Sequence, residues 1–185
     1  MESKKTKMQS FWEIVRFTII ALIIVIPIRL FIAEPFIVSG DSMVPTFNNG
    51  NYLIVDKLSY EMGNPQRDDI IIFKYPIDPS KYFIKRIIGL PNETVDIQGN
   101  TITITNAAHP EGFTLTQPFI INPADNDTHI TLTKDQYFVM GDNRRFSSDS
   151  RAWGPVNRNL IVGKVFLRLW PVNKIDVLPG NYKQS

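Results

Sequence analysis

The segment FIVSGDSMVPTF, residues 36–47, marks the point at which the chain changes from a helical to a strand pattern. It holds a Ser-Gly-Asp-Ser turn followed by Met43 and Pro45, directly after a long apolar run. Glycine and proline at these positions favour a tight, fixed turn, which can expose a serine hydroxyl beside backbone N–H groups. Read alone, the turn is compatible with a nucleophile, although serine and glycine in a loop usually form only an ordinary loop.

The apolar run before this turn covers residues 11–33 and is long enough to cross a membrane. A cleaved secretory signal would need small residues in an A-x-A pattern at the end of the apolar run, and no such pattern occurs there. A buried core helix would show a polar face, which this run lacks. A retained anchor fits best, and Lys4, Lys5 and Lys7 favour a cytoplasmic amino terminus. We therefore expect a single-pass cell-membrane protein with a cytoplasmic tail (1–10), an anchor (11–33) and an extracytoplasmic domain (34–185).

Composition excludes several classes of site. The chain has 185 residues, no cysteine and two histidines, so thiolate chemistry is absent and few metal sites or Ser-His-Asp triads are possible. A formal charge of +2 and the lack of a basic stripe argue against nucleic acid as a partner. We expect neither a metal nor a cofactor.

Beyond residue 33 the pattern predicts a mostly β domain, because runs of β-branched and aromatic residues alternate with turn signals. The expected strands are 36–38, 52–55, 70–74, 82–88, 94–97, 101–104, 137–140 and 160–170. Residues 106–135 are rich in Pro, Asp, Asn and Thr, contain both histidines and are expected to form an irregular insert or small subdomain.

Two further segments have residues suited to chemistry. In YFIKRIIGLPNE, residues 82–93, strand alternation places Lys85 between apolar neighbours and Arg86 on the opposite face. Burial of Lys85 would lower its pKa and make it a base for a serine, whereas a half-exposed strand would leave it an ordinary charged lysine. In MGDNRRFSSDSR, residues 140–151, dense short polar side chains predict a rigid supporting loop, although a surface loop is also compatible.

Together, in this order behind an amino-terminal anchor, the three segments resemble the motifs of bacterial type I signal peptidases, also called leader peptidases. The resemblance covers about residues 10–170 apart from the insert, and the single anchor is similar to the short form of the family. It implies an antiparallel β-sheet fold shared with self-cleaving SOS repressors, and a membrane-bound serine endopeptidase with a Ser-Lys dyad.

The resemblance also implies roles for individual residues. Ser42 corresponds to the nucleophile, Lys85 to the general base and Ser147 to the serine that orients the lysine amine. Two structural ion pairs are implied, Asp149 with Arg151 and Asp142 with Arg86.

One position departs from part of the family. Gly40 stands where some members have a serine that completes the oxyanion hole, so the backbone N–H groups of Ser42, Gly40 and Asp41 are expected to serve instead. Residues expected to line shallow substrate pockets are Val38, Met43, Phe83, Ile84 and Met140.

The implied reaction removes signal peptides from secreted preproteins by cleavage after small residues in an Ala-x-Ala pattern, through an acyl-enzyme. The expected partners are such preproteins, the lipid bilayer and, as a possibility, the secretion translocon. Two alternatives stay open at this point. One is a specialised signal peptidase with a narrow substrate set, and the other is a non-catalytic membrane-anchored assembly factor.

Overall fold

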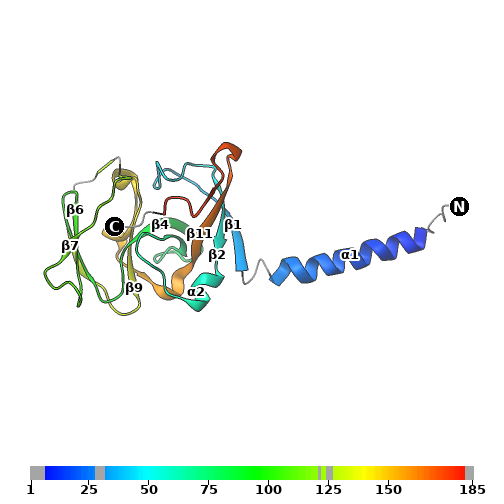
Figure 1. Cartoon of the computed structure of the whole chain (residues 1–185), viewed down its shortest axis with the longest axis horizontal. Coiled ribbons are helices and arrows are strands. Elements are labelled where there is room, and N and C mark those ends of the chain that lie inside the picture. Colours follow the sequence, from blue (N-terminus) through cyan, green and yellow to red (C-terminus); the bar gives the residue numbers. More distant parts are fainter. Residues whose placement is uncertain (1–6, 28–31, 121, 124–126, 182–185) are drawn as a thin grey trace.

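A computed structural model describes residues 7–27, 32–120, 122, 123 and 127–181. Helix α1 (Lys7–Pro27) extends away from a β domain, and none of the apolar window Ser10–Pro27 is buried against that domain (Figure 1). This window has a mean hydropathy of 1.9 and is long and apolar enough to span a membrane. The predicted anchor, residues 11–33, thus coincides with a described helix as far as Pro27, while residues 28–31 lie outside the described part of the chain.

The main sheet contains eight strands among the described residues, in the order β1-β2-β11-β3-β4-β9-β10, with β12 paired to β11. Every pairing between the described strands of this sheet is antiparallel, so the predicted antiparallel β fold behind an apolar helix is confirmed. The strands are β1 (Ala33–Ile37), β2 (Tyr52–Asp56), β3 (Ile70–Lys74), β4 (Tyr82–Gly89), β9 (Gln136–Met140), β10 (Val156–Asn157), β11 (Ile161–Trp170) and β12 (Asp176–Val177).

A smaller second sheet lies at the end of the domain opposite α1 (Figure 1). Its four described strands have the order β7-β6-β5-β8, comprising β5 (Thr94–Gln98), β6 (Thr101–Thr105), β7 (Phe113–Thr114) and β8 (Thr128–Thr131). The segment 106–135, expected to form an irregular insert or small subdomain, supplies both outer strands of this sheet. These two strands were not predicted, because they are short and their pairing partners lie outside the segment.

Central strand β3 shows why the core forms here. Its sequence IIIFK is buried on both faces, so Ile70 and Ile72 enter one apolar cluster while Ile71 and Phe73 enter another. A third cluster joins Ile88 and Met140 to the second sheet. Short helices complete the described elements: α2 (Leu58–Met62), α3 (Ser150–Trp153) and single turns at 144–146, 158–160 and 172–174.

The main sheet leaves two strand edges unpaired close to each other. Strand β4 pairs with β9 only from Arg86 onward, so no described strand covers the same side of β4 at residues 82–85. Strand β1 pairs with β2 alone among the described strands. The side chains of Phe36 on β1 and Tyr82 on β4 approach each other between these two unpaired edges, with ring centroids 5.4 Å apart.

We predict that removing residues 1–27 leaves the thermal unfolding midpoint of the β domain unchanged, because α1 buries no surface against it. Thermal denaturation followed by circular dichroism, with the full chain in detergent as reference, measures this. Removal of residues 1–37 is the matched control and should lower the midpoint, since it deletes β1 and the packing of Phe36 against the first cluster. Equal loss in both truncations would contradict the prediction.

Candidate active site

The side chains of Ser42 and Lys85 are in contact beside the cleft between strands β1 and β4. Ser42 lies in the loop between β1 and β2, and Lys85 lies on β4 opposite Ile71 of β3. The Lys85 Nζ and Ser42 Oγ atoms are 2.7 Å apart, which is within range for direct proton transfer. Lys85 Nζ also donates to the Ile84 carbonyl oxygen at 2.9 Å, so the amine is held from two sides.

Burial changes the acidity of the Lys85 amine. The residue is 4% exposed, and this loss of solvation lowers its pKa from 10.5 to about 8, against the opposing effect of the nearby Asp149 and Asp142 carboxylates. Each carboxylate is also paired with an arginine. With a pKa of about 8, roughly a tenth of the amine is neutral at pH 7, and this fraction rises as the pH increases.

The loop that follows β9 packs directly against the nucleophile loop. A Cβ atom at Gly141 would lie 2.4 Å from the Ser42 carbonyl oxygen and 2.3 Å from Ser147 Oγ. Asn143 donates its backbone N–H to the same Ser42 carbonyl at 3.0 Å. Glycine is needed at 141 because any side chain would separate the first and third motifs.

Two buried ion pairs support this arrangement. Asp142 accepts from Arg86 Nε at 2.8 Å and Nη2 at 2.7 Å, and both side chains are completely buried. Asp149 accepts from Arg151 Nε and Nη2, each at 2.8 Å, and also caps helix α3. Both pairs that the resemblance implied are thus present.

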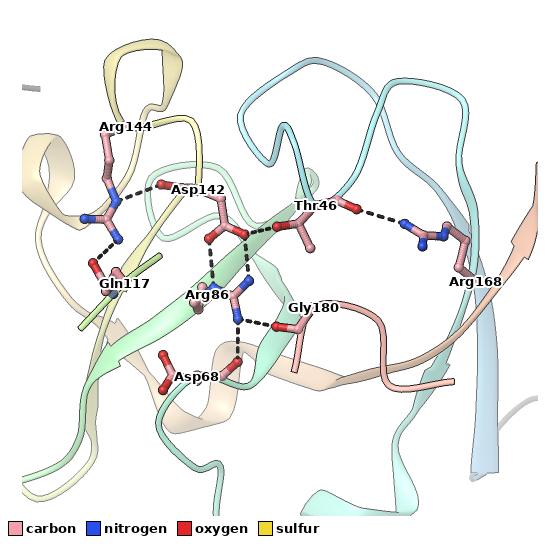
Figure 2. A network of polar contacts seen from close by, with 9 residues as sticks. Thr46, Asp68, Arg86, Gln117, Asp142, Arg144, Arg168 and Gly180 are labelled. Atoms are coloured by element: carbon pink, nitrogen blue, oxygen red, sulfur yellow. Dashed lines mark hydrogen bonds and ion pairs between the residues drawn. The ribbon is translucent and has the colours of Figure 1, made fainter. Parts of the chain in front are cut away.

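The first ion pair belongs to a larger polar network (Figure 2). Arg86 also donates to the carbonyl oxygens of Asp68 and Gly180, while the Thr46 hydroxyl donates to Asp142. Arg168 of β11 donates to the Thr46 carbonyl at 2.9 Å. The network therefore joins β4, β11, the nucleophile loop and the carboxyl-terminal segment. Thr46 and Gly180 were missed by the sequence analysis, although Thr46 belongs to the quoted segment.

Ser147 lies beside the dyad without the hydrogen bond expected of it. The Ser147 Oγ atom lies close to Gly141. This oxygen is buried and has no hydrogen-bond partner among the described residues. The role of Ser147 in orienting the amine stays a prediction.

The backbone N–H groups expected to form an oxyanion hole differ in whether they already make a hydrogen bond within the protein. Gly40 has φ +90°, a conformation that favours glycine and explains the absence of a serine there. Its N–H donates to Asn49 Oδ1 at 3.1 Å and is already used. The N–H groups of Asp41 and Ser42 make no hydrogen bond to any described residue, and their part in an oxyanion hole stays a prediction.

A cleft of about 470 Å³ opens beside the dyad between β1 and β4. Val38, Phe83 and Ile84 line it, as expected from the sequence, together with Ser42 and Lys85. The residues that sequence reasoning missed are Phe36, Ile37, Ser39, Leu53, Ile72, Lys81, Tyr82 and Ser148.

Met43 and Met140, also expected to line a substrate pocket, do not line this cleft. Met43 is buried in the first apolar cluster, and Met140 packs in the third cluster and faces a separate cavity. The alternation of a strand predicts which face a side chain takes but not whether that face is open.

No group of three or more His, Asp or Glu residues that could hold a metal ion occurs within the part of the chain that the structure describes. His109 and His129 are exposed and lie near Glu111 and Asp96, respectively. The expected absence of a metal or cofactor stays a prediction.

The antiparallel β fold and the contact between the Ser42 and Lys85 side chains indicate a hydrolase built on a β domain. Comparison with known proteins agrees: the family model described as "Signal peptidase, peptidase S26" matches residues 11–170. The chain belongs to this signal peptidase family, as predicted from the three motifs. With the apolar helix α1, this supports a membrane-anchored peptidase.

Similar proteins include a signal peptidase I from Leptolyngbya laminosa, which is 37% identical over 88% of this chain and 82% of its own length. A probable signal peptidase I-2 from Synechocystis sp. is 34% identical over 100% of this chain and 85% of its own. A crystal structure of a signal peptidase I from Enterococcus faecalis has 30% identity, covers 56% of this chain and 97% of its own, and gives a TM-score of 0.47.

We predict that Asp142→Asn costs about 3–5 kcal/mol of unfolding free energy, because it leaves the fully buried Arg86 charge without a counter-ion. Urea denaturation of the chain without residues 1–27 measures the loss. Asp78→Asn is the matched control: it breaks the solvent-exposed pair with Lys81 and should leave stability nearly unchanged. Equal effects of the two substitutions would contradict a special role for the buried pair.

Proposed function

We propose that this chain removes amino-terminal signal peptides from secreted preproteins, with Ser42 as the nucleophile and Lys85 as the general base. The observation that carries the proposal is the 2.7 Å separation of Lys85 Nζ and Ser42 Oγ beside an open cleft. Membership of the signal peptidase family and relatives named signal peptidase I support the substrate class.

The proposed chemistry follows from the buried amine. Neutral Lys85 accepts the Ser42 proton as the hydroxyl oxygen attacks the carbonyl carbon of the scissile bond. The protonated amine then gives the proton to the leaving nitrogen, which releases the mature protein and leaves the signal peptide as an ester on Ser42. Water, deprotonated by the same amine, hydrolyses this ester. Two N–H bonds of neutral Lys85 stay free to donate, and one of them is directed at the Ile84 carbonyl.

Substrate binding as an added strand is supported by the two unpaired edges of β1 and β4. An extended peptide lying between them satisfies backbone groups on both sides, and the cleft supplies the side-chain pockets. Val38, Phe83 and Ile84 give that cleft apolar walls. In the proposed specificity, small residues at the first and third positions before the bond fit between these walls, whereas larger side chains collide with them.

We further propose that the amino terminus is cytoplasmic and the β domain extracytoplasmic, following the lysines before α1. Strand β1 begins at Ala33, shortly after α1 ends at Pro27, and the nucleophile follows at residue 42. The short connection keeps the dyad near the bilayer, where precursors with a hydrophobic signal segment are concentrated. Contact with the secretion translocon belongs to this proposal as well.

We predict that Ser42→Ala and Lys85→Ala each abolish cleavage of a precursor carrying Ala-x-Ala before its mature sequence. The detergent-solubilised protein is incubated with the precursor, and products are identified by mass spectrometry. Lys74→Ala is the control, because this exposed lysine on β3 lies outside the cleft and should retain full activity. Substantial cleavage by Lys85→Ala would refute the dyad. Absence of cleavage by the unaltered chain would favour a non-catalytic assembly factor.

We predict that kcat/KM rises with pH up to a midpoint near the lowered pKa of Lys85, about 8. The active form is the neutral amine, so activity should fall about tenfold for each pH unit below that midpoint. Initial rates measured on a short peptide substrate across the range test this. A flat profile over the two units below the midpoint would contradict a lysine base.

A further inference from the structure

The peptide group between Asp41 and Ser42 links the nucleophile loop to the third motif. A peptide bond is planar and almost always trans, so the Asp41 carbonyl and the Ser42 N–H belong to one rigid plane and point in opposite directions. Fixing the carbonyl therefore fixes the direction of the N–H. This N–H makes no hydrogen bond to any described residue and belongs to the same residue as the reactive hydroxyl.

Asn143 donates hydrogen bonds to the carbonyl oxygens of two successive peptide groups, Asp41–Ser42 and Ser42–Met43. In the first of these groups the bonded oxygen points away from the Ser42 N–H. The side-chain Nδ2 of Asn143 donates to the Asp41 carbonyl oxygen at 3.0 Å, and its backbone N–H donates to the Ser42 carbonyl oxygen at 3.0 Å. The Asp41 carbonyl also accepts from the N–H of Val44 at 3.2 Å. Asn143 is 5% exposed, so these bonds face little competition from water.

Asn122 determines which way the Asn143 amide points. An asparagine amide can present either its oxygen or its nitrogen, and its partners decide between them. Asn122 Nδ2 donates to Asn143 Oδ1 at 2.9 Å, which directs Asn143 Nδ2 toward Asp41. The Asn122 carbonyl in turn accepts from the N–H of Arg145 at 3.2 Å, so two contacts tie Asn122 to the loop after β9.

We infer that Asn143 is a positioning residue that aims the Ser42 N–H at the developing oxyanion, and that Asn122 fixes the Asn143 amide in the orientation this requires. The inference rests on the proposed function and extends it to residues with no assigned role. It also gives the segment 106–135 a part in catalysis, although that segment contributes no residue to the cleft.

The first test compares Asn143→Ala with the unaltered chain. Loss of an oxyanion donor in other enzymes lowers kcat by about 100- to 1000-fold, so a donor that is misdirected rather than deleted should lower kcat by about 10- to 100-fold. KM and the pH midpoint set by Lys85 should stay unchanged. Affinity for a peptide boronate, which forms a tetrahedral adduct on Ser42, should fall by a similar factor, whereas affinity for an uncleavable ground-state peptide should not.

The second test is a double-mutant cycle with Asn122→Ala. This substitution should lower kcat several-fold in the unaltered background and have no further effect on kcat in the Asn143→Ala background. Asn106→Ala is the matched control in the same segment: it removes hydrogen bonds to Glu93 and to the N–H groups of Ala108 and His109, none of which contacts the loop after β9, and should leave kcat unchanged. Thermal unfolding of every variant confirms that the folded protein is being assayed.

Different results separate the two hypotheses. If the unaltered chain cleaves precursor and Ser42→Ala does not, the dyad stands. If Asn143→Ala then keeps full kcat, or loses affinity for boronate and ground-state peptide equally, or shifts the pH midpoint, the positioning role is overturned. Additive effects of Asn122→Ala and Asn143→Ala would overturn the part assigned to Asn122.

Discussion

The completely buried pair of Arg86 and Asp142 is the interaction on which the rest of the site depends. Arg86 follows Lys85 on β4, and Asp142 follows Gly141 after β9, so one bidentate contact fixes the relation of two motifs far apart in sequence. The Thr46 hydroxyl joins the remaining motif, residues 36–47, to the same carboxylate. A buried charge without its partner is strongly unfavourable, so the three segments are stable only when assembled together.

This assembly also determines the surroundings of the Lys85 amine, which is the proposed base. A neutral amine requires burial, but burial among carboxylates would favour its charged form. In this structure Asp142 and Asp149 each accept two hydrogen bonds from an arginine and support the loop around Lys85. The two carboxylates favour the charged amine, but the loss of solvation has the larger effect and lowers the pKa of Lys85.

Sequence reasoning reached the strands because they depend on local pattern, whereas the pairing of Ser42 with Lys85 was implied only by the resemblance of three ordered motifs to a known family. Alternation along β4 separates Lys85 from Arg86, and each of them meets a partner suited to its face. It failed where the outcome depends on contacts between distant segments. Met43 and Met140 are apolar residues next to the motifs, but neighbouring elements close over them, and the sequence does not record that closure. The strands within 106–135 are likewise defined by pairing with β5 and β6 rather than by their own composition.

The second sheet shows why the site is more than its three motifs. Gln117 accepts from Arg144, and Asn122 donates to Asn143, so the segment between β7 and β8 contacts consecutive residues of the loop after β9. That loop has no regular structure until the single turn at 144–146, and its backbone groups need partners from elsewhere. The segment between β7 and β8 provides one of them, because the Asn122 carbonyl accepts from the Arg145 N–H, and it does so without lining the cleft. Its influence on the nucleophile turn is therefore exerted through the loop after β9, by way of the amide that it presents to Asn143.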